Sequence, residues 1–309
     1  MALHNSADNK LVQALHRPLR MTLRYLLSGL WLAATLSGCT TLSIVPSDDW
    51  EHRLRGDSIV LLGEIHDNAE HHQLRLDVLR RALVGGWRPA IAMEQFDRER
   101  QDDIDRARRE KPHDAQYVID LAGLAVGASR GNWHWDFYRP FVALALEFDV
   151  PLIAVNLSNA DITKVVRGGY EAVFDAESKQ ALGLAAHIPA ALQAAQERAI
   201  EAGHCNALPP TMVPAMTRGQ LARDTVMASI VSQHAAQGVV LLAGNGHVRR
   251  NTGVPRWLSS SKQAQVFVVG YLEHGNHAAV STEFDAVVRV AAIERTDPCI
   301  TFRKRSKSL

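Results

Sequence analysis

Four side chains with catalytic or metal-binding chemistry follow apolar runs of the chain. Glu64 and His66 come directly after the run IVLL, Glu94 ends the run AIAME, and His247 follows VVLLAGNG. Uninterrupted apolar runs of this kind are typical of strands buried on both faces of a parallel sheet. Parallel strands share one carboxyl edge, where such sheets bind their ligands. We therefore expect the four side chains to converge on one concavity at that edge.

Two kinds of chemistry fit these carboxylates and imidazoles. Glu64, His66 and His247 offer the oxygen and nitrogen ligands that a divalent metal takes, with Glu94 acting as a base toward a metal-bound water. The same four residues also suit paired general acid and base catalysis without a metal. Glycines beside the histidines fit both arrangements, because a tight turn with close backbone approach leaves no room for a Cβ atom.

Three further polar residues lie near this group. His71 and His72 fall on the helix expected after the first strand, where we expect at least one to face solvent and neither to hold a ligand. Arg223 occupies an inner position of the helical pattern GQLARDTVMASIV, and a buried arginine is costly unless it is paired. We expect Arg223 to support the site by binding a carboxylate such as Glu64 or Glu94, and the alternative is an ordinary solvated helix face.

The elements that position these residues alternate along the chain. Short apolar runs alternate with amphipathic stretches, which predicts an α/β domain with a mainly parallel central sheet flanked by helices. Residues 168–212 lack a strand pattern, and we interpret them as a helical insertion of two short helices that caps the sheet rim. The expected strands are 58–63, 90–94, 151–156, 239–245, 265–272 and 286–291, and the expected helices are 68–84, 97–109, 113–126, 136–148, 159–167 and 219–236.

The amino terminus has the pattern of a secretory signal. Arginines precede an apolar stretch at residues 25–36 that is short for a membrane span. The sequence LSGC that follows resembles a bacterial lipobox, which predicts cleavage before Cys39 and a lipid anchor on that cysteine. The alternative is an N-terminal anchor helix with an incidental cysteine. Either Met1 or Met21 is the start of the chain.

These patterns divide the chain into four segments. We expect a lipoprotein signal peptide at 1–38, a tether at 39–57, the α/β domain at 58–295 and a basic tail at 296–309. In the oxidising compartment that export implies, Cys205 and Cys299 could form a disulfide, but the sequence alone leaves this pairing open.

Composition limits the classes of partner. The 309 residues contain 34 lysines and arginines against 33 aspartates and glutamates, so no strong positive field attracts nucleic acid. Fourteen histidines are many for a chain of this length and favour a metal or haem.

Five ordered motifs resemble a known family. LLGEIHDN, MEQF, FYRP, ARDTVMA and LLAGNGHV, after a lipobox, are similar to the ChaN family of haem-binding lipoproteins, within the Tiki and erythromycin-esterase superfamily. The resemblance extends from residue 58 to about 275. It implies an α/β domain, a place at the bacterial outer membrane, and a role in haem or iron uptake. It also implies that tyrosine and histidine hold haem between two subunits of a homodimer, and that an outer-membrane haem receptor is a further partner.

The resemblance leaves the haem ligand open. Tyr138, Tyr170 and His204 are all candidates for the residue that binds the haem iron. Tyr170 and His204 lie in the helical insertion, where a dimer could enclose haem. Tyr138 lies in the FYRP motif, among aromatic residues whose helical spacing is typical of a packed core.

The wider superfamily implies an alternative function. It includes metal-dependent proteases and esterases that use the strand-end elements found here at Glu64, His66, Glu94 and His247. The alternative to haem binding is therefore a metal-dependent hydrolase, with a divalent metal as its cofactor.

Overall fold

The computed structural model describes residues 50–56, 58–124, 133–275, 283–297, 299 and 300. The chain divides into two units, Met1–Pro46 and Ser47–Leu309, and all described residues belong to the second. The expected signal peptide, Cys39, most of the tether and the end of the basic tail lie outside the described residues. No helix among the described residues is both long and apolar enough to cross a membrane.

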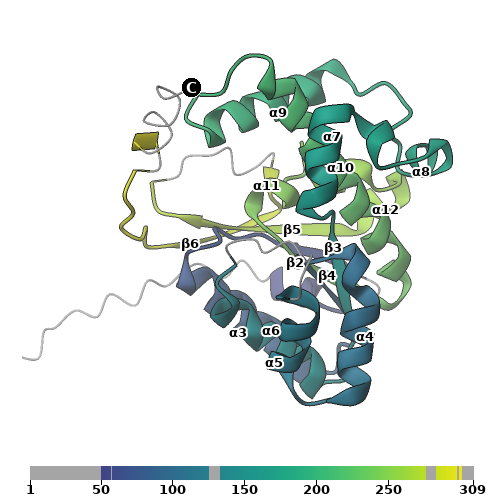
Figure 1. Ribbon diagram of the computed structural model, residues 1–309. Coiled ribbons are helices and arrows are strands. Elements are labelled where there is room, and N and C mark those ends of the chain that lie inside the picture. The colour runs from purple at the N-terminus through teal and green to yellow at the C-terminus, as the bar shows by residue number, and fades with distance from the viewer. Residues whose placement is uncertain (1–49, 57, 125–132, 276–282, 298, 301–309) are drawn as a thin grey trace, which may run out of the picture. The chain divides into compact units, whose positions relative to one another are not determined.

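A six-stranded sheet forms the centre of the described domain (Figure 1), and every pair of neighbouring strands is parallel. The strand order is β3-β2-β4-β1-β5-β6. This arrangement confirms the α/β fold with a mainly parallel sheet, and each expected strand is present. The strands are β1 (Ile59–Leu62), β2 (Ala90–Asp97), β3 (Leu152–Asn156), β4 (Val239–Leu242), β5 (Val266–Glu273) and β6 (Ala286–Val290).

Helices cover both faces of the sheet. In Figure 1, α3, α4, α5 and α6 lie on one side and α7, α10 and α12 on the other. Their bounds are α3 (Ala69–Val84), α4 (Gln101–Glu110), α5 (Ala115–Val118), α6 (Trp135–Glu147), α7 (Asn159–Gly168), α8 (Ala176–Ala181), α9 (Ala190–Gly203), α10 (Met212–His234), α11 (Asn245–Val248) and α12 (Ser260–Gln265). Short single-turn helices are η1 (Trp50–Arg53), η2 (Arg98–Arg100), η3 (Ile119–Gly123), η4 (Tyr170–Ala172), η5 (Ala235–Gln237) and η6 (Val254–Trp257).

The side chains of β1 alternate between the two cores. Val60 and Leu62 belong to the core under α3 and α6, whereas Ile59 and Leu61 belong to the core under α10. Because β1 is central and covered on both faces, all four of its residues are fully buried. The chain must therefore place its first polar side chains after Leu62, at the carboxyl edge of the sheet.

The insertion at 168–212 is helical, as expected, and contains η4, α8 and α9. The next helix, α10, begins at Met212, seven residues before the expected start. A disulfide joins Cys205, just after α9, to Cys299 near the end of the described chain, with 5.4 Å between their Cα atoms. The structure thus pairs the two cysteines whose pairing the sequence left open.

Candidate functional site

Glu64 is the buried centre of the loop that follows β1. Its Oε1 accepts a hydrogen bond from the Tyr138 hydroxyl at 2.6 Å and lies 2.7 Å from His66 Nδ1. Its Oε2 forms an ion pair with Arg75 of α3, which is fully buried. Burial lowers the pKa of Arg75 to about 10, so the guanidinium keeps its charge at neutral pH. The carboxylate is therefore compensated by a cation and held in place by two donors.

His66 is the exposed imidazole of the same loop. Its side chain is 48% exposed, and its ring lies edge-on to Trp133 with 4.9 Å between the ring centroids. Because the Glu64 carboxylate can only accept a hydrogen bond, His66 Nδ1 carries the proton of that bond. Among the described residues, none hydrogen-bonds to His66 Nε2, so this is the ring nitrogen open to a ligand. A carboxylate hydrogen-bonded to one ring nitrogen is the arrangement that orients a metal-binding histidine.

His71 and His72 are both buried, so the expectation that at least one faces solvent is wrong. His71 Nδ1 accepts a hydrogen bond from the Ile65 N–H at 3.0 Å, and His72 Nε2 donates one to the His66 carbonyl oxygen at 3.0 Å. Burial lowers the pKa of each to about 4, so both are neutral near pH 7. The two histidines brace the loop that presents Glu64 and His66.

His247 is held between two carboxylates at the end of β4. Its Nδ1 lies 2.5 Å from Asp224 Oδ1, and its Nε2 lies 3.4 Å from Glu94 Oε1. Burial alone would lower the pKa of His247, but the charges of Glu94 and Asp224 outweigh it and raise this pKa to about 10. Burial raises the pKa of Asp224, whereas the His247 charge outweighs burial at Glu94 and lowers the pKa there. Held between these two carboxylates, His247 carries a positive charge in this arrangement near neutral pH.

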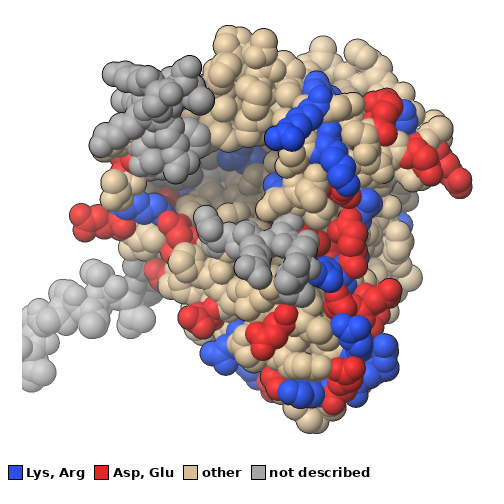
Figure 2. All heavy atoms as spheres, in the orientation of Figure 1, with Lys and Arg blue, Asp and Glu red and all other residues tan. Residues whose placement is uncertain are grey.

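The Glu64–His66 pair and His247 meet at a pocket of about 370 Å³ at the carboxyl edge of the sheet, the rim pocket. Glu64, His66 and His247 line it, and Glu94 adjoins it by accepting a hydrogen bond from the Gly244 N–H at 2.7 Å. The structure thus brings together the four side chains that the sequence singles out. Figure 2 shows the surface hollowed below α9, with basic side chains in and beside the hollow.

Helix α9 of the insertion covers one side of this rim pocket. Gln196 on α9 is buried and donates hydrogen bonds to Asp224 Oδ2 at 3.2 Å and to the Thr252 carbonyl oxygen at 2.9 Å. Ala199 and Ile200 of the same helix also line the pocket. The insertion therefore caps the sheet rim, as the sequence predicted.

Comparison with known proteins identifies the family. A family model described as haem-binding uptake, Tiki superfamily, ChaN matches residues 50–258, which is more than half of the chain. The chain belongs to the ChaN family. This confirms the resemblance seen in the five motifs, and it makes haem the ligand associated with the family. No curated protein sequence matches the chain.

A solved structure agrees with the ChaN fold. The chain is similar to a structure of ChaN from Campylobacter jejuni described as showing cofacial haem binding, with a TM-score of 0.59 and 20% sequence identity over 78% of this chain and 90% of that chain. It is also similar to an erythromycin esterase, with a TM-score of 0.38 and 12% identity over 72% of each chain. The first of these supports the fold of the described domain.

The three candidate haem ligands of this ChaN-family chain lie in different environments. Tyr138 is fully buried and donates its hydroxyl proton to Glu64, and burial raises its pKa. Tyr170 packs beside the apolar cluster under α7 and α10, and burial raises its pKa to about 12. His204 follows α9 and donates from Nδ1 to the Ile200 carbonyl oxygen at 2.7 Å. Among the described residues that line the rim pocket, none is one of these three.

Arg223 does not play the expected supporting role. Its Nη2 donates to Asn159 Oδ1 at 2.7 Å, and the arginine paired with Glu64 is Arg75. Asp224 and Gln196 also belong to the surroundings of His247, and the sequence alone did not point to either. Asp224 follows Arg223 in the same helical pattern. Successive helix residues are about 100° apart, so when Arg223 turns away from the site, Asp224 can face His247.

The hydrolase alternative stays a prediction. No group of three or more histidine, cysteine, aspartate or glutamate side chains among the described residues is arranged to hold a metal ion. In the described arrangement Glu64 and Glu94 are each paired with a cation, Arg75 and His247 respectively. Metal analysis of the purified protein, with the His66→Ala and His247→Ala variants alongside, would test this alternative.

Proposed function

We propose that this protein is a lipid-anchored, haem-binding protein of haem uptake and that His66 binds the haem iron from the rim pocket. The main support is the geometry of His66 in a chain of the ChaN family. Its Nδ1 lies 2.7 Å from Glu64 Oε1, and this hydrogen bond fixes the orientation of the ring and so of Nε2. Imidazole is a common axial ligand of haem, and a hydrogen bond to its other nitrogen strengthens it as a ligand. The donor set at the rim therefore fits haem.

The environments of Tyr138 and Tyr170 make them weaker ligands. Iron takes the phenolate form of tyrosine, and burial favours the neutral phenol at both positions. Tyr138 would also have to give up its hydrogen bond to Glu64. His204 remains a candidate from the insertion.

The size of the rim pocket supports a haem site shared by two copies. At about 370 Å³ it lies near the lower end of the range of about 300–1,000 Å³ found for small-molecule sites. A ligand as broad as haem would extend beyond it, and a second copy of the chain would cover the exposed face. The Campylobacter jejuni protein is described as binding haem cofacially. Two haems stacked face to face fit a homodimer in which each copy contributes one rim pocket.

The location follows from the amino-terminal motif. We propose that the signal peptide at 1–38 is removed, that Cys39 is lipidated, and that the anchor holds the protein at the bacterial outer membrane. An outer-membrane haem receptor would then be its partner. Labelling with a palmitate analogue should mark the wild type and not Cys39→Ser. Equal labelling of both would contradict the anchor.

Haem titration tests the central proposal. Full-length protein should give a shifted Soret band at micromolar haem, and His66→Ala should lose most of this shift. His113→Ala is the matched control, because it removes an exposed histidine that does not line the rim pocket, and it should bind haem as the wild type does. If Tyr170→Phe or His204→Ala abolishes the shift while His66→Ala retains it, His66 is not the iron ligand. Sedimentation with and without haem would test the dimer.

A further inference from the structure

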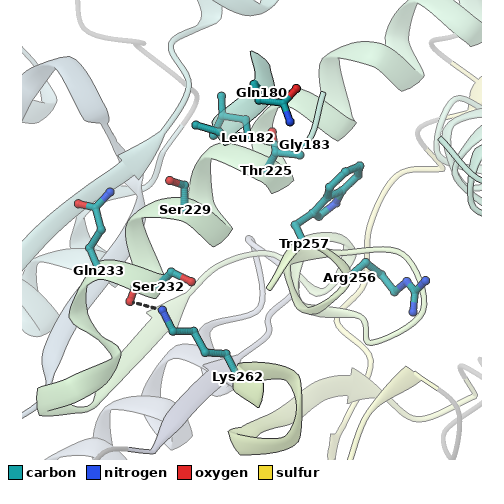
Figure 3. A pocket seen from close by; sticks show the side chains of 11 residues that line it. Gln180, Leu182, Gly183, Thr225, Ser229, Ser232, Gln233, Arg256, Trp257 and Lys262 are labelled. Atoms are coloured by element: carbon teal, nitrogen blue, oxygen red, sulfur yellow. Dashed lines mark hydrogen bonds between the residues drawn. The ribbon is translucent and has the colours of Figure 1, made fainter. Parts of the chain in front are cut away.

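A second cavity, of about 630 Å³, lies on a different face of α10 from the rim pocket. Gln220 of α10 lines the rim pocket, whereas Thr225, Ser229 and Ser232 line the second cavity. The remaining walls come from α8 with the turn after it, and from η6 and α12. Figure 3 shows Ser229, Ser232 and Lys262 on one side of this cavity, and Trp257 and Arg256 on the other.

The α10 wall of this cavity is a row of hydroxyl groups. Thr225, Ser229 and Ser232 follow each other at intervals of four and three residues, which places them on one helix face. Thr225 donates its hydroxyl proton to the Ala222 carbonyl oxygen at 3.0 Å, so its oxygen is left as an acceptor. Ser229 and Ser232 are half-buried. The wall therefore offers several short, well-placed hydrogen-bonding groups.

The cavity is positively charged. Lys262 Nζ donates one hydrogen bond, to the Ser232 carbonyl oxygen at 2.8 Å, and keeps two further protons for other acceptors. Neither Lys262 nor Arg256 forms an ion pair with a described carboxylate, and no aspartate or glutamate is among the described lining residues. The other lysines that the structure describes each pair with a carboxylate: Lys111, Lys164 and Lys179.

We propose that this cavity binds a negatively charged monosaccharide derivative, such as a hexose phosphate or a hexuronate. The two cations supply the attraction for the negative group, and the serine hydroxyls with Gln180 and Gln233 match the hydroxyl groups of a sugar. Trp257 gives a flat ring against which the apolar C–H face of a pyranose packs. The cavity volume is within the range of about 300–1,000 Å³ for small-molecule sites.

Calorimetric titration of the full-length protein tests this site with four probes: glucose 6-phosphate, glucuronate, glucose and inorganic phosphate. We expect at least one of the two charged sugars to bind, and glucose and phosphate to bind at least about tenfold more weakly, because each lacks one part of the recognised chemistry. Lys262→Gln and Arg256→Gln should each weaken binding of the charged sugar by about tenfold, the loss of one charge-assisted hydrogen bond. Lys111→Gln is the matched control and should leave it unchanged.

Three results would overturn the proposal. The first is no binding of either charged sugar by the wild type. The second is phosphate binding as tightly as glucose 6-phosphate, which would indicate a simple anion site. The third is unchanged affinity in both Lys262→Gln and Arg256→Gln. Thermal unfolding checks each variant, and if Lys262→Gln fails to fold, the exposed Arg256 decides the outcome.

Discussion

His72 donates a hydrogen bond from Nε2 to the backbone carbonyl oxygen of His66, at 3.0 Å. One residue earlier on α3, His71 accepts a hydrogen bond from the Ile65 N–H. The loop that presents His66 to the rim pocket is therefore fastened to the buried face of α3 by two neutral imidazoles. His71 and His72 therefore fix the conformation of this loop although neither lines the rim pocket.

Replacing His71 by leucine should destabilise the protein and weaken haem binding together. The variant leaves the Ile65 N–H without its acceptor, and an unsatisfied buried donor costs about 1–3 kcal/mol. Urea denaturation measures the free energy of unfolding, and haem titration measures the site. His113→Leu, at an exposed position, should change the free energy of unfolding by less than about 0.5 kcal/mol. Equal stability of the His71 and His113 variants would contradict the brace.

Acid should destabilise the fold as pH falls from about 6.5 toward 4. Burial lowers the pKa of His71 and His72 from 6.5 to about 4, so the unfolded chain binds these protons at a higher pH than the folded protein does. Their contribution to stability is complete above pH 6.5 and is lost as pH drops through that window. His71→Gln keeps a hydrogen-bond acceptor but cannot titrate, so its unfolding free energy should fall less steeply there. A slope identical to that of the wild type would rule out His71 as a source of the acid sensitivity.

The contribution of His247 to folding stability should be lost as the pH rises, in contrast to that of His71 and His72. Its pKa is raised to about 10 by Glu94 and Asp224, against the opposing effect of burial, so this group stabilises the fold fully below pH 6.5 and loses its contribution as pH rises toward 10. Asp224→Asn removes one of the two carboxylates and should lower this pKa. Denaturation curves recorded between pH 6 and 10 should then show the loss of stability beginning at a lower pH in the variant. An unshifted alkaline limb would mean that Asp224 does not set the charge of His247.

Replacing Arg75 by methionine should destabilise the protein far more than replacing Arg223 by methionine. Arg75→Met leaves Glu64 buried without its cation, and breaking one partner of a buried ion pair costs about 3–5 kcal/mol. Arg223→Met removes only a partly exposed hydrogen bond to Asn159 and should cost about 1 kcal/mol or less. Chemical denaturation of the two variants side by side measures the difference. Comparable losses would restore Arg223 to the supporting role that its sequence position suggested.

Local sequence patterns predicted most of the fold and the four strand-end residues of the site, but not the partners that hold them. Apolar runs and strand ends are local properties, so the sequence could predict the parallel sheet and the convergence of Glu64, His66, Glu94 and His247. The partners of these residues lie elsewhere in the chain, and their contacts depend on helix rotation. Asp224 faces His247, whereas Arg223, about 100° away around α10, faces α7.

Helix α3 shows why the buried histidines were misjudged. Its buried residues are His71, His72, Arg75, Val78, Leu79 and Leu83, which follow helical spacing. Polar side chains occupy the amino-terminal part of this buried face. A pattern based on hydrophobicity assigns such positions to solvent, and only the position of α3 under the rim loop shows that their hydrogen-bonding partners lie inside the protein.

Gly244→Ala should disturb His66 without unfolding the protein. A Cβ atom at position 244 would lie 2.9 Å from His66 Cε1, closer than real Cβ atoms come, and a tight 3.0 Å from Nε2. Because the His66 side chain is half exposed, its ring can move away at little cost to the fold, but Nε2 then leaves the position that Glu64 sets. We expect the haem affinity, measured from the Soret shift, to fall by about tenfold or more. The free energy of unfolding should stay within about 1 kcal/mol of the wild type. Gly246→Ala is the matched control, because a Cβ atom there meets nothing within 4 Å although Gly246 lines the same pocket. Haem affinity that is equally retained in both alanine variants would show that the position of the His66 ring does not determine haem binding.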